Sequence, residues 1–151
     1  ELTYAGQNIR NLSFDKDARN ISRRYRDFIS ILIMSFVAKR FEKNEPPYTA
    51  EDISEECQIP IRLTNQTLYE LQEINLLHEV VTDAKSQDIA YQPSMDISKL
   101  NVALLLDKLD THGSEDFKID KDKEFHGQWE TLMKAREEYY KSASQVLLKD
   151  L

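Results

Sequence analysis

The chain has 151 residues, of which 40% are hydrophobic and 31% charged, and its formal net charge is -7. This length and composition are typical of one globular domain with a core of its own. A single cysteine excludes an internal disulfide, and three glycines and four prolines favour a mostly helical fold with short connections.

The first strong pattern is a long helix, predicted from about Ala18 to Lys43 after a polar segment, residues 1–17. Its centre, Phe28 to Ala38, is nearly all apolar. Eleven residues cannot span a bilayer, which needs about twenty, so we expect a core helix. Basic side chains flank the apolar centre, and those before it are Arg19, Arg23, Arg24 and Arg26.

A winged helix-turn-helix is predicted between Pro46 and Gln92, and the rest of the chain is organised around it. Thr49, followed three residues later by Asp52, has the pattern of a capping box and begins a short helix. Pro60 suits the first position of the next helix, predicted from Ile61 to Ile74, because its missing amide proton costs nothing there.

The wing is predicted from two short strands after this helix. Asn75 suits the left-handed turn out of the helix. Leu76–Val81 is expected to form a strand, Thr82–Asp88 a polar loop and Ile89–Gln92 the return strand. An ordinary helical hairpin beside a β-hairpin remains the alternative.

Two further helices are predicted after the wing. One runs from about Ser98 to Thr111 and is closed by Gly113. A charged connector, Glu115–Lys123, leads to a long amphipathic helix, Lys123–Leu151, which we expect to pack against the first long helix or against its copy in a dimer. Its candidate packing or dimer residues are Trp129, Leu132, Tyr139 and Tyr140.

The predicted fold class is therefore mostly α with a small β-hairpin: a winged helix-turn-helix flanked by long N- and C-terminal helices. Residues 18–113 form the winged-helix domain with its long first helix. Residues 114–151 are the connector and a C-terminal helix that packs on the same domain.

No catalytic constellation is visible in the sequence. His78, His112 and His126 are far apart, and none has a neighbour at metal-ligand spacing. There is no glycine-rich phosphate loop, and one cysteine cannot hold a metal cluster. We therefore predict no catalytic, metal-binding or cofactor-binding residues, no cofactor and no enzymatic activity.

Nucleic-acid binding is the natural function of a winged helix, whose second motif helix would lie in the major groove. The candidate base-reading face is Arg62, Asn65, Gln66 and Tyr69. Affinity, however, comes chiefly from neutralising phosphates, and residues 46–83 carry one arginine against eight carboxylates. We therefore do not expect nucleic acid as a partner, and the basic residues of 19–26 suit anionic lipid headgroups or an acidic protein surface.

Several short runs resemble one membrane-protein family. The opening Glu1-Leu2-Thr3-Tyr4-Ala5 resembles the end of the "GAEL" signature that closes the last transmembrane helix of the YihY/BrkB family, formerly labelled ribonuclease BN. The runs Asn20–Phe28, Lys39–Phe41, Pro46–Thr49 and Tyr91–Pro93 are similar to the soluble extension that follows the membrane part. The winged-helix part also resembles iron–sulfur repressors with the same helix order, but the three cluster cysteines are absent, so cluster sensing is not implied.

The membrane-family resemblance implies a bacterial inner-membrane protein whose tail faces the cytoplasm. Because the chain begins without an initiator methionine, we expect it to be a piece of a longer protein, with residues 1–17 following a missing membrane part. The basic residues before the first long helix would then lie close to the membrane.

Three hypotheses about function follow. The first is a non-catalytic cytosolic winged-helix domain of a membrane protein that acts as a protein-interaction or regulatory module, with a protein partner or a second copy of itself. The second is a DNA-binding transcriptional regulator. The third is the tRNA-processing ribonuclease of the family's older name, which no metal-binding cluster in these residues supports.

Overall fold

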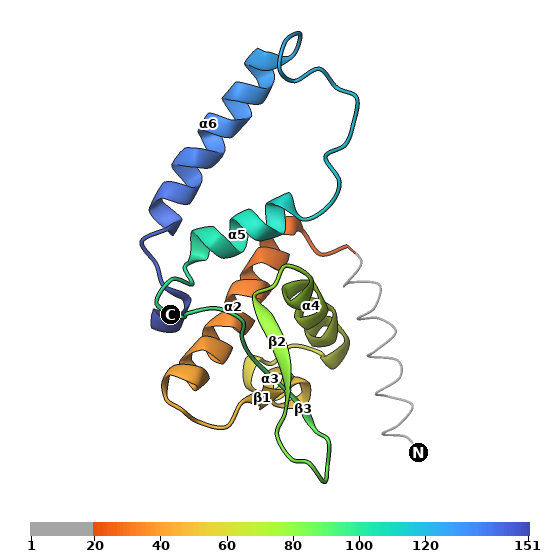
Figure 1. Cartoon of the computed structure of the whole chain (residues 1–151), viewed down its shortest axis with the longest axis vertical. Coiled ribbons are helices and arrows are strands. Elements are labelled where there is room, and N and C mark those ends of the chain that lie inside the picture. The colour runs from red at the N-terminus through yellow and green to blue at the C-terminus, as the bar shows by residue number, and fades with distance from the viewer. Residues whose placement is uncertain (1–19) are drawn as a thin grey trace.

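The computed structural model describes residues 20–151, so residues 1–17 and Arg19 lie outside the described part (Figure 1). This part is mostly helical, with one antiparallel sheet of three strands in the order β1-β3-β2. The winged-helix fold class predicted from the sequence is confirmed, although the sheet has one strand more than the expected hairpin. In chain order the elements are α2 (Arg23–Glu42), β1 (Tyr48–Thr49), α3 (Ala50–Cys57), α4 (Ile61–Glu73), β2 (Leu77–Val81), β3 (Ile89–Pro93), α5 (Val102–Thr111), α6 (His126–Ala143) and the 3₁₀ helix η1 (Leu148–Asp150).

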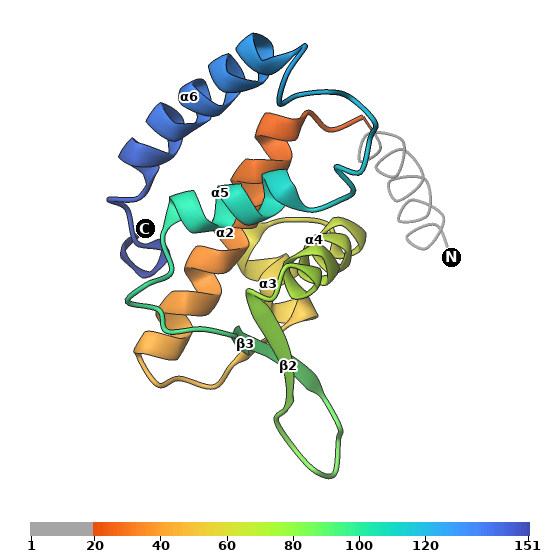
Figure 2. The same ribbon diagram turned by 45° about the horizontal axis from the view of Figure 1, so that its top comes forward.

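Helix α2 is the central element of the core. Ser22 caps its N-terminus by accepting a hydrogen bond from the backbone N–H of Tyr25 at 3.2 Å. Helix α5 crosses it, and β3, α3 and η1 also pack on it (Figures 1 and 2). Its apolar centre is therefore covered by the protein's own elements, and the fully buried members are Ile29, Ile33, Met34, Val37 and Ala38. Among the described helices none is sufficiently long and apolar to cross a membrane.

The helix-turn-helix is held by short-range hydrogen bonds that the sequence predicts in part. Both bonds of the Thr49–Asp52 capping box form, at 3.0 and 3.2 Å. Gln58 takes the left-handed conformation between α3 and α4, with φ 54°. The Ser54 hydroxyl donates to the carbonyl of Ile59 at 2.6 Å. These bonds satisfy the polar groups of the turn and fix how α4 leaves α3.

The wing is the β2–β3 hairpin, which is in register from Leu77 opposite Pro93 to Val81 opposite Ile89. Asn75 turns the chain out of α4 with φ 60°, as predicted. The loop of residues 82–88 is exposed throughout and projects away from the helices (Figure 2). Strand β1 was not predicted, because it has only two residues and exists through its pairing with β3.

The C-terminal third departs most from the prediction. Helix α5 begins at Val102, where the Asn101 side chain caps it by accepting from the Leu104 N–H at 2.8 Å, and not near Ser98. The expected helix to Leu151 ends at Ala143. The chain then returns to the core as η1, and the Leu148 side chain is 0% exposed.

Helix α6 lies on the outside of the molecule, at the end opposite the wing (Figures 1 and 2). Its principal neighbour within the chain is α5, while η1 takes the place on α2 that we expected for the long C-terminal helix. Helix α6 contains no buried residue, although it carries several large apolar side chains. Helix α6 itself therefore packs mainly on α5, whereas the end of the predicted C-terminal helix, η1, packs on the first long helix as expected.

Candidate nucleic-acid interface

The outer face of α4 brings together all four residues of the predicted base-reading set. The opposite face is buried in the core through Leu63, Thr64, Thr67, Leu68 and Leu71. Arg62, Asn65, Gln66 and Tyr69 are exposed, and 63% of Tyr69 is accessible. Their spacing of three, four and seven residues places them on one side of the helix.

This face has the chemistry needed to contact base edges. An arginine can donate two hydrogen bonds to guanine, and asparagine or glutamine can pair with adenine in the same bidentate way. The two threonines of α4 do not compete for these contacts, because they point inward. The Thr64 hydroxyl donates to the Pro60 carbonyl at 3.1 Å, and the Thr67 hydroxyl donates to the Leu63 carbonyl at 2.8 Å.

The wing carries one lysine, on the loop that projects away from the helices (Figure 2). Lys85 lies at the exposed tip, where its backbone N–H donates to the Asp83 carboxylate at 2.9 Å. The Thr82 N–H closes the loop on the Asp88 carbonyl at 3.1 Å. Helix α4 leads directly into β2, so the outer face of α4 and the wing belong to one continuous unit.

The acidic side chains that argued against nucleic acid occupy definite positions. Four lie on α3, where Glu51, Asp52, Glu55 and Glu56 are exposed. Glu73 is exposed at the end of α4. The Asp52 carboxylate serves the capping box, which explains one of these acids by a local structural role. The remaining carboxylates would reduce affinity for phosphate, so contacts with DNA depend on the few cations nearby.

The predicted membrane-proximal arginines are divided by the structure. Arg24 and Arg26 are exposed on the first turn of α2. Arg23 instead lies 2.5 Å from one carboxylate oxygen of Asp110, at the end of α5. The basic residue Arg23 therefore has an acidic partner within the chain.

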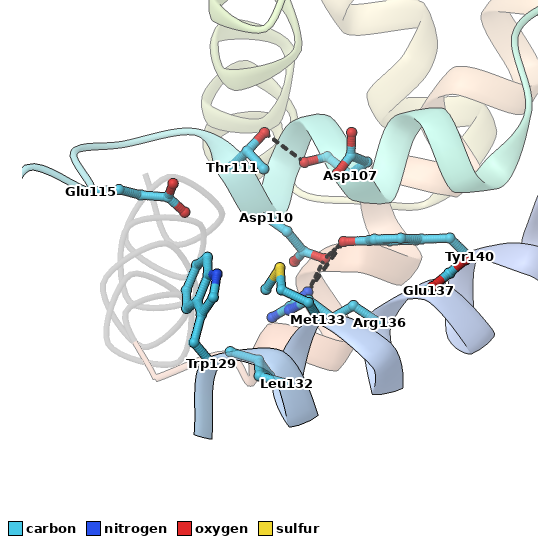
Figure 3. Close-up of a pocket in the computed structure, with 10 residues that line it drawn as sticks. All are labelled: Asp107, Asp110, Thr111, Glu115, Trp129, Leu132, Met133, Arg136, Glu137 and Tyr140. Atoms are coloured by element: carbon cyan, nitrogen blue, oxygen red, sulfur yellow. Dashed lines mark hydrogen bonds and ion pairs between the residues drawn. The ribbon is translucent and has the colours of Figure 1, made fainter. Parts of the chain in front are cut away.

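Asp110 is the centre of a polar cluster that the sequence analysis missed. Its second oxygen lies 2.5 Å from the Arg136 guanidinium, and the Tyr140 hydroxyl also donates to it (Figure 3). Burial acts to raise the pKa of Asp110, but the hydrogen bonds from Tyr140 and Arg23 and the charges of Arg136 and Arg23 outweigh it and lower that pKa. Burial and the bond to Asp110 raise the pKa of Tyr140, so its hydroxyl remains a donor.

The four candidate packing residues of α6 differ in their exposure. Trp129 and Tyr140 are half-buried and face α5. Leu132 and Tyr139 are 45% and 51% exposed. Only the latter pair remains largely available to another molecule.

Metal and thiol chemistry have no visible site in the described residues. No group of three or more histidine, cysteine or acidic side chains within residues 20–151 is placed to hold a metal ion. Cys57 is half-buried, and burial, with a smaller contribution from Glu56, raises the pKa of its thiol to about 11. Its thiolate form is therefore scarce at neutral pH, and the residue serves packing.

No family model and no curated protein matches the sequence. Solved structures do match the fold. T. potens IscR is 18% identical with a TM-score of 0.58, and the match covers 86% of this chain and 83% of that one. CymR, the global cysteine regulator of B. subtilis, is 15% identical with a TM-score of 0.58, over 86% of this chain and 93% of that one. A Listeria innocua protein assigned as a transcriptional regulator is 15% identical with a TM-score of 0.56, over 83% and 82%.

The resemblance to the YihY/BrkB membrane-protein family is wrong. The matches extend over most of this chain and of the regulators, so the long N- and C-terminal helices belong to the same architecture as the winged helix. The feature that suggested a membrane-proximal tail, an apolar helix with basic flanks, is the core helix α2, and one of its exposed arginines, Arg23, is paired with Asp110 of the same chain. The short sequence runs carried too little information to distinguish these origins.

Proposed function

We propose that this chain is a DNA-binding winged-helix transcriptional regulator. In this proposal α4 enters the major groove and reads bases through Arg62, Asn65, Gln66 and Tyr69. The wing contributes Lys85 to the phosphate backbone. The observation that carries the proposal is the exposed polar face on the second helix of the motif, on a fold shared with proteins described as regulators.

This proposal replaces the first hypothesis and several expectations tied to it. The structures that share the fold are described as transcriptional regulators and not as the cytosolic domain of a membrane protein. Nucleic acid, which the charge count seemed to exclude, becomes the leading partner. A position at the cytoplasmic face of an inner membrane rested only on the rejected family resemblance, and it is withdrawn with it.

The regulator hypothesis also accounts for the missing catalytic chemistry. Transcriptional regulators act by binding, and two of the proteins that share this fold are described as regulators. The acidic motif then has a specific consequence. Because few cations face the phosphates, non-specific affinity should be weak, and a larger share of specific affinity must come from base contacts by α4.

The first experiment is the selection of bound duplexes from a random DNA library, followed by fluorescence anisotropy with the selected duplex from about 50 mM to about 200 mM salt. We expect a selected sequence to bind far more tightly than random DNA. Arg62→Ala, Asn65→Ala and Gln66→Ala should each weaken the selected complex by roughly five- to one-hundredfold, the cost of losing one bidentate base contact.

The matched control is Glu138→Gln, an exposed position on α6 remote from α4. It should leave the anisotropy curve unchanged, and circular dichroism should show that all variants are folded. Failure to enrich any sequence at the lowest salt, where counterion release most favours binding, would remove the DNA-binding proposal.

A further inference from the structure

A cavity of about 480 Å³ lies between α5 and α6, beneath the connector that joins them (Figure 3). This volume is within the range of pockets that hold small organic molecules, roughly 300–1,000 Å³. The cavity is separate from the proposed DNA-reading face, because no residue of α4 lines it. The proposed function therefore leaves it unexplained.

One side of the cavity is apolar and aromatic. Helix α6 contributes Trp129, Leu132 and Met133, which lie along successive turns beside the opening (Figure 3). Leu132 and Met133 remain 45% and 36% exposed, so residues 20–151 leave this apolar surface partly uncovered. An apolar ligand group placed here would be removed from water and would gain binding energy from its buried area.

The polar lining is strongly unbalanced in charge. Among the described residues, four carboxylates and one guanidinium, that of Arg136, line the cavity. Arg136 is already engaged by Asp110, so the described lining offers no further cation to the other three acids. They come from three different segments, α5, the connector and α6, as Asp107, Glu115 and Glu137.

The Trp129 ring already contacts a positively charged side chain of the same protein. The ammonium of Lys121, from the connector, lies 4.5 Å from the centre of the indole ring. This distance is typical of a cation–π interaction, in which the negative face of the ring attracts a positive group. The Lys121 ammonium thus shows that the Trp129 ring can bind a primary ammonium group.

We infer that the cavity between α5 and α6 binds a small organic cation, an amine carried on an apolar or aromatic body. The body would lie against Trp129, Leu132 and Met133, and the ammonium would face Glu115, which lies on the Trp129 side of the cavity (Figure 3). An anionic ligand is disfavoured by the carboxylates of the lining. A neutral ligand would gain the apolar contact but none of the electrostatic attraction.

The Asp110 cluster connects this cavity with the helix-turn-helix domain. Asp110 lines the cavity and contacts Arg136 of α6 and Arg23 of α2 at the same time. A cation bound among the neighbouring carboxylates would change the field at Asp110 and so the balance of these two contacts. An effect of the ligand on DNA affinity rests on the proposed function, whereas binding itself does not.

Trp129 is the only tryptophan in the chain, so its emission reports directly on the cavity. The test is a fluorescence titration of the full chain with 2-phenylethylamine, with 2-phenylethanol as the neutral analogue and phenylacetate as the anionic one. We expect a saturable change in emission with the amine, binding of the alcohol that is roughly tenfold weaker, and no saturable change with phenylacetate.

A double variant isolates the electrostatic contribution. Glu115→Gln combined with Glu137→Gln should weaken amine binding by roughly tenfold while leaving the alcohol titration unchanged. Glu138→Gln, on the same helix but outside the lining, should bind the amine as the unaltered chain does. Thermal melting monitored by circular dichroism establishes that each variant is folded.

Equal affinity for the amine, the alcohol and phenylacetate would overturn the inference, and so would the absence of saturation with the amine. A change of Trp129 emission that follows protein concentration and is insensitive to amine would also overturn it, by assigning the cavity to contact with a second copy. Amine binding without any DNA binding would instead reject only the proposed function, and DNA binding without amine binding would reject only this inference.

Discussion

At the scale of single residues, Asp110 is the most informative position in the chain. It is where three helices meet, and its side chain is only 11% exposed. Its lowered pKa means that the folded protein favours the carboxylate more than the unfolded chain does. Asp110 therefore contributes stability at pH values above its unfolded pKa, and this contribution is lost as the pH falls through the folded pKa.

We predict that Asp110→Asn lowers the free energy of unfolding at neutral pH by about 1–3 kcal/mol, because charge-assisted hydrogen bonds from Arg23, Arg136 and Tyr140 are lost or weakened. The difference from the unaltered chain should shrink below about pH 4. Nearby Asp27 acts in the opposite sense, since burial and then Asp110 raise its pKa, so part of the effect is offset. Urea unfolding at several pH values measures the difference.

Asp107→Asn, on the same helix, is the control and should change stability little at any pH. A stability difference for Asp110→Asn that is constant from neutral to acid pH would show that charge at this position does not matter. The cluster could not be predicted from sequence. The partner of Arg136 is known only once α5 and α6 are placed side by side.

At the scale of elements, the C-terminal hook, residues 144–151, returns the chain from α6 to the core. It is the segment with the largest predicted effect on stability. Helix η1 packs on α2, and the Leu148 N–H donates to the Leu100 carbonyl at 3.0 Å. Lys149 adds an ion pair with Glu42 at 2.8 Å. The last residues thus close the core, although α6 just before them contains no buried residue.

Leu148→Ala should destabilise the protein by about 2–5 kcal/mol, because it removes a fully buried side chain and leaves a cavity in the core. Leu151→Ala is the matched control, since Leu151 is 47% exposed and should cost much less. Urea denaturation followed by far-ultraviolet circular dichroism compares the two. Equal midpoints for the two variants would mean that the hook is not part of the cooperative core.

These elements also show which features of the fold are determined by residues close together in the sequence. The capping box at Thr49 and the left-handed Asn75 are short-range signals, and the structure has both where the sequence predicts them. Pro60 stands one position earlier than expected, as the N-cap of α4 and not as its first residue. Strand β1 and the buried Leu148 depend on partners far along the chain, Tyr91 and Leu100. The exposed polar face of α4 was predictable from helical spacing alone, whereas the DNA-binding function proposed for it was not, because the charge count argued against it.

At the scale of the whole molecule, the proposed DNA-binding surface and the exposed apolar surface of α6 lie in different parts of the protein. The wing and α4 belong to one part, and α6 with its uncovered apolar side chains lies at the other end (Figure 1). The cavity between α5 and α6 lies next to the Asp110 cluster. A two-copy assembly joined through α6 would leave both copies of α4 free to contact one duplex.

We therefore predict that the chain is a dimer, with a mass by light scattering of twice the 17.7 kDa of one chain at micromolar concentration. The structure favours Leu132 and Tyr139 as contact residues over Trp129 and Tyr140, because the first pair is exposed and the second is half-buried. Leu132 also lines the cavity between α5 and α6, so a dimer contact there and a ligand in the cavity would compete for it. Leu132→Glu combined with Tyr139→Glu should shift the mass toward that of one chain, since it places charges in an apolar contact. Glu138→Gln should remain dimeric.

The same assembly predicts the form of the DNA site. A twofold dimer presents two copies of α4, so the selected duplex should be a palindrome whose half-sites are read one helical turn apart, about 34–36 Å, or a multiple of that spacing. The monomeric double variant should keep the half-site preference of α4 but lose affinity for the full palindrome, because the two half-sites no longer bind as one unit. A single chain mass at every accessible concentration, with an enriched sequence that lacks symmetry, would contradict the dimer and leave α6 with another partner.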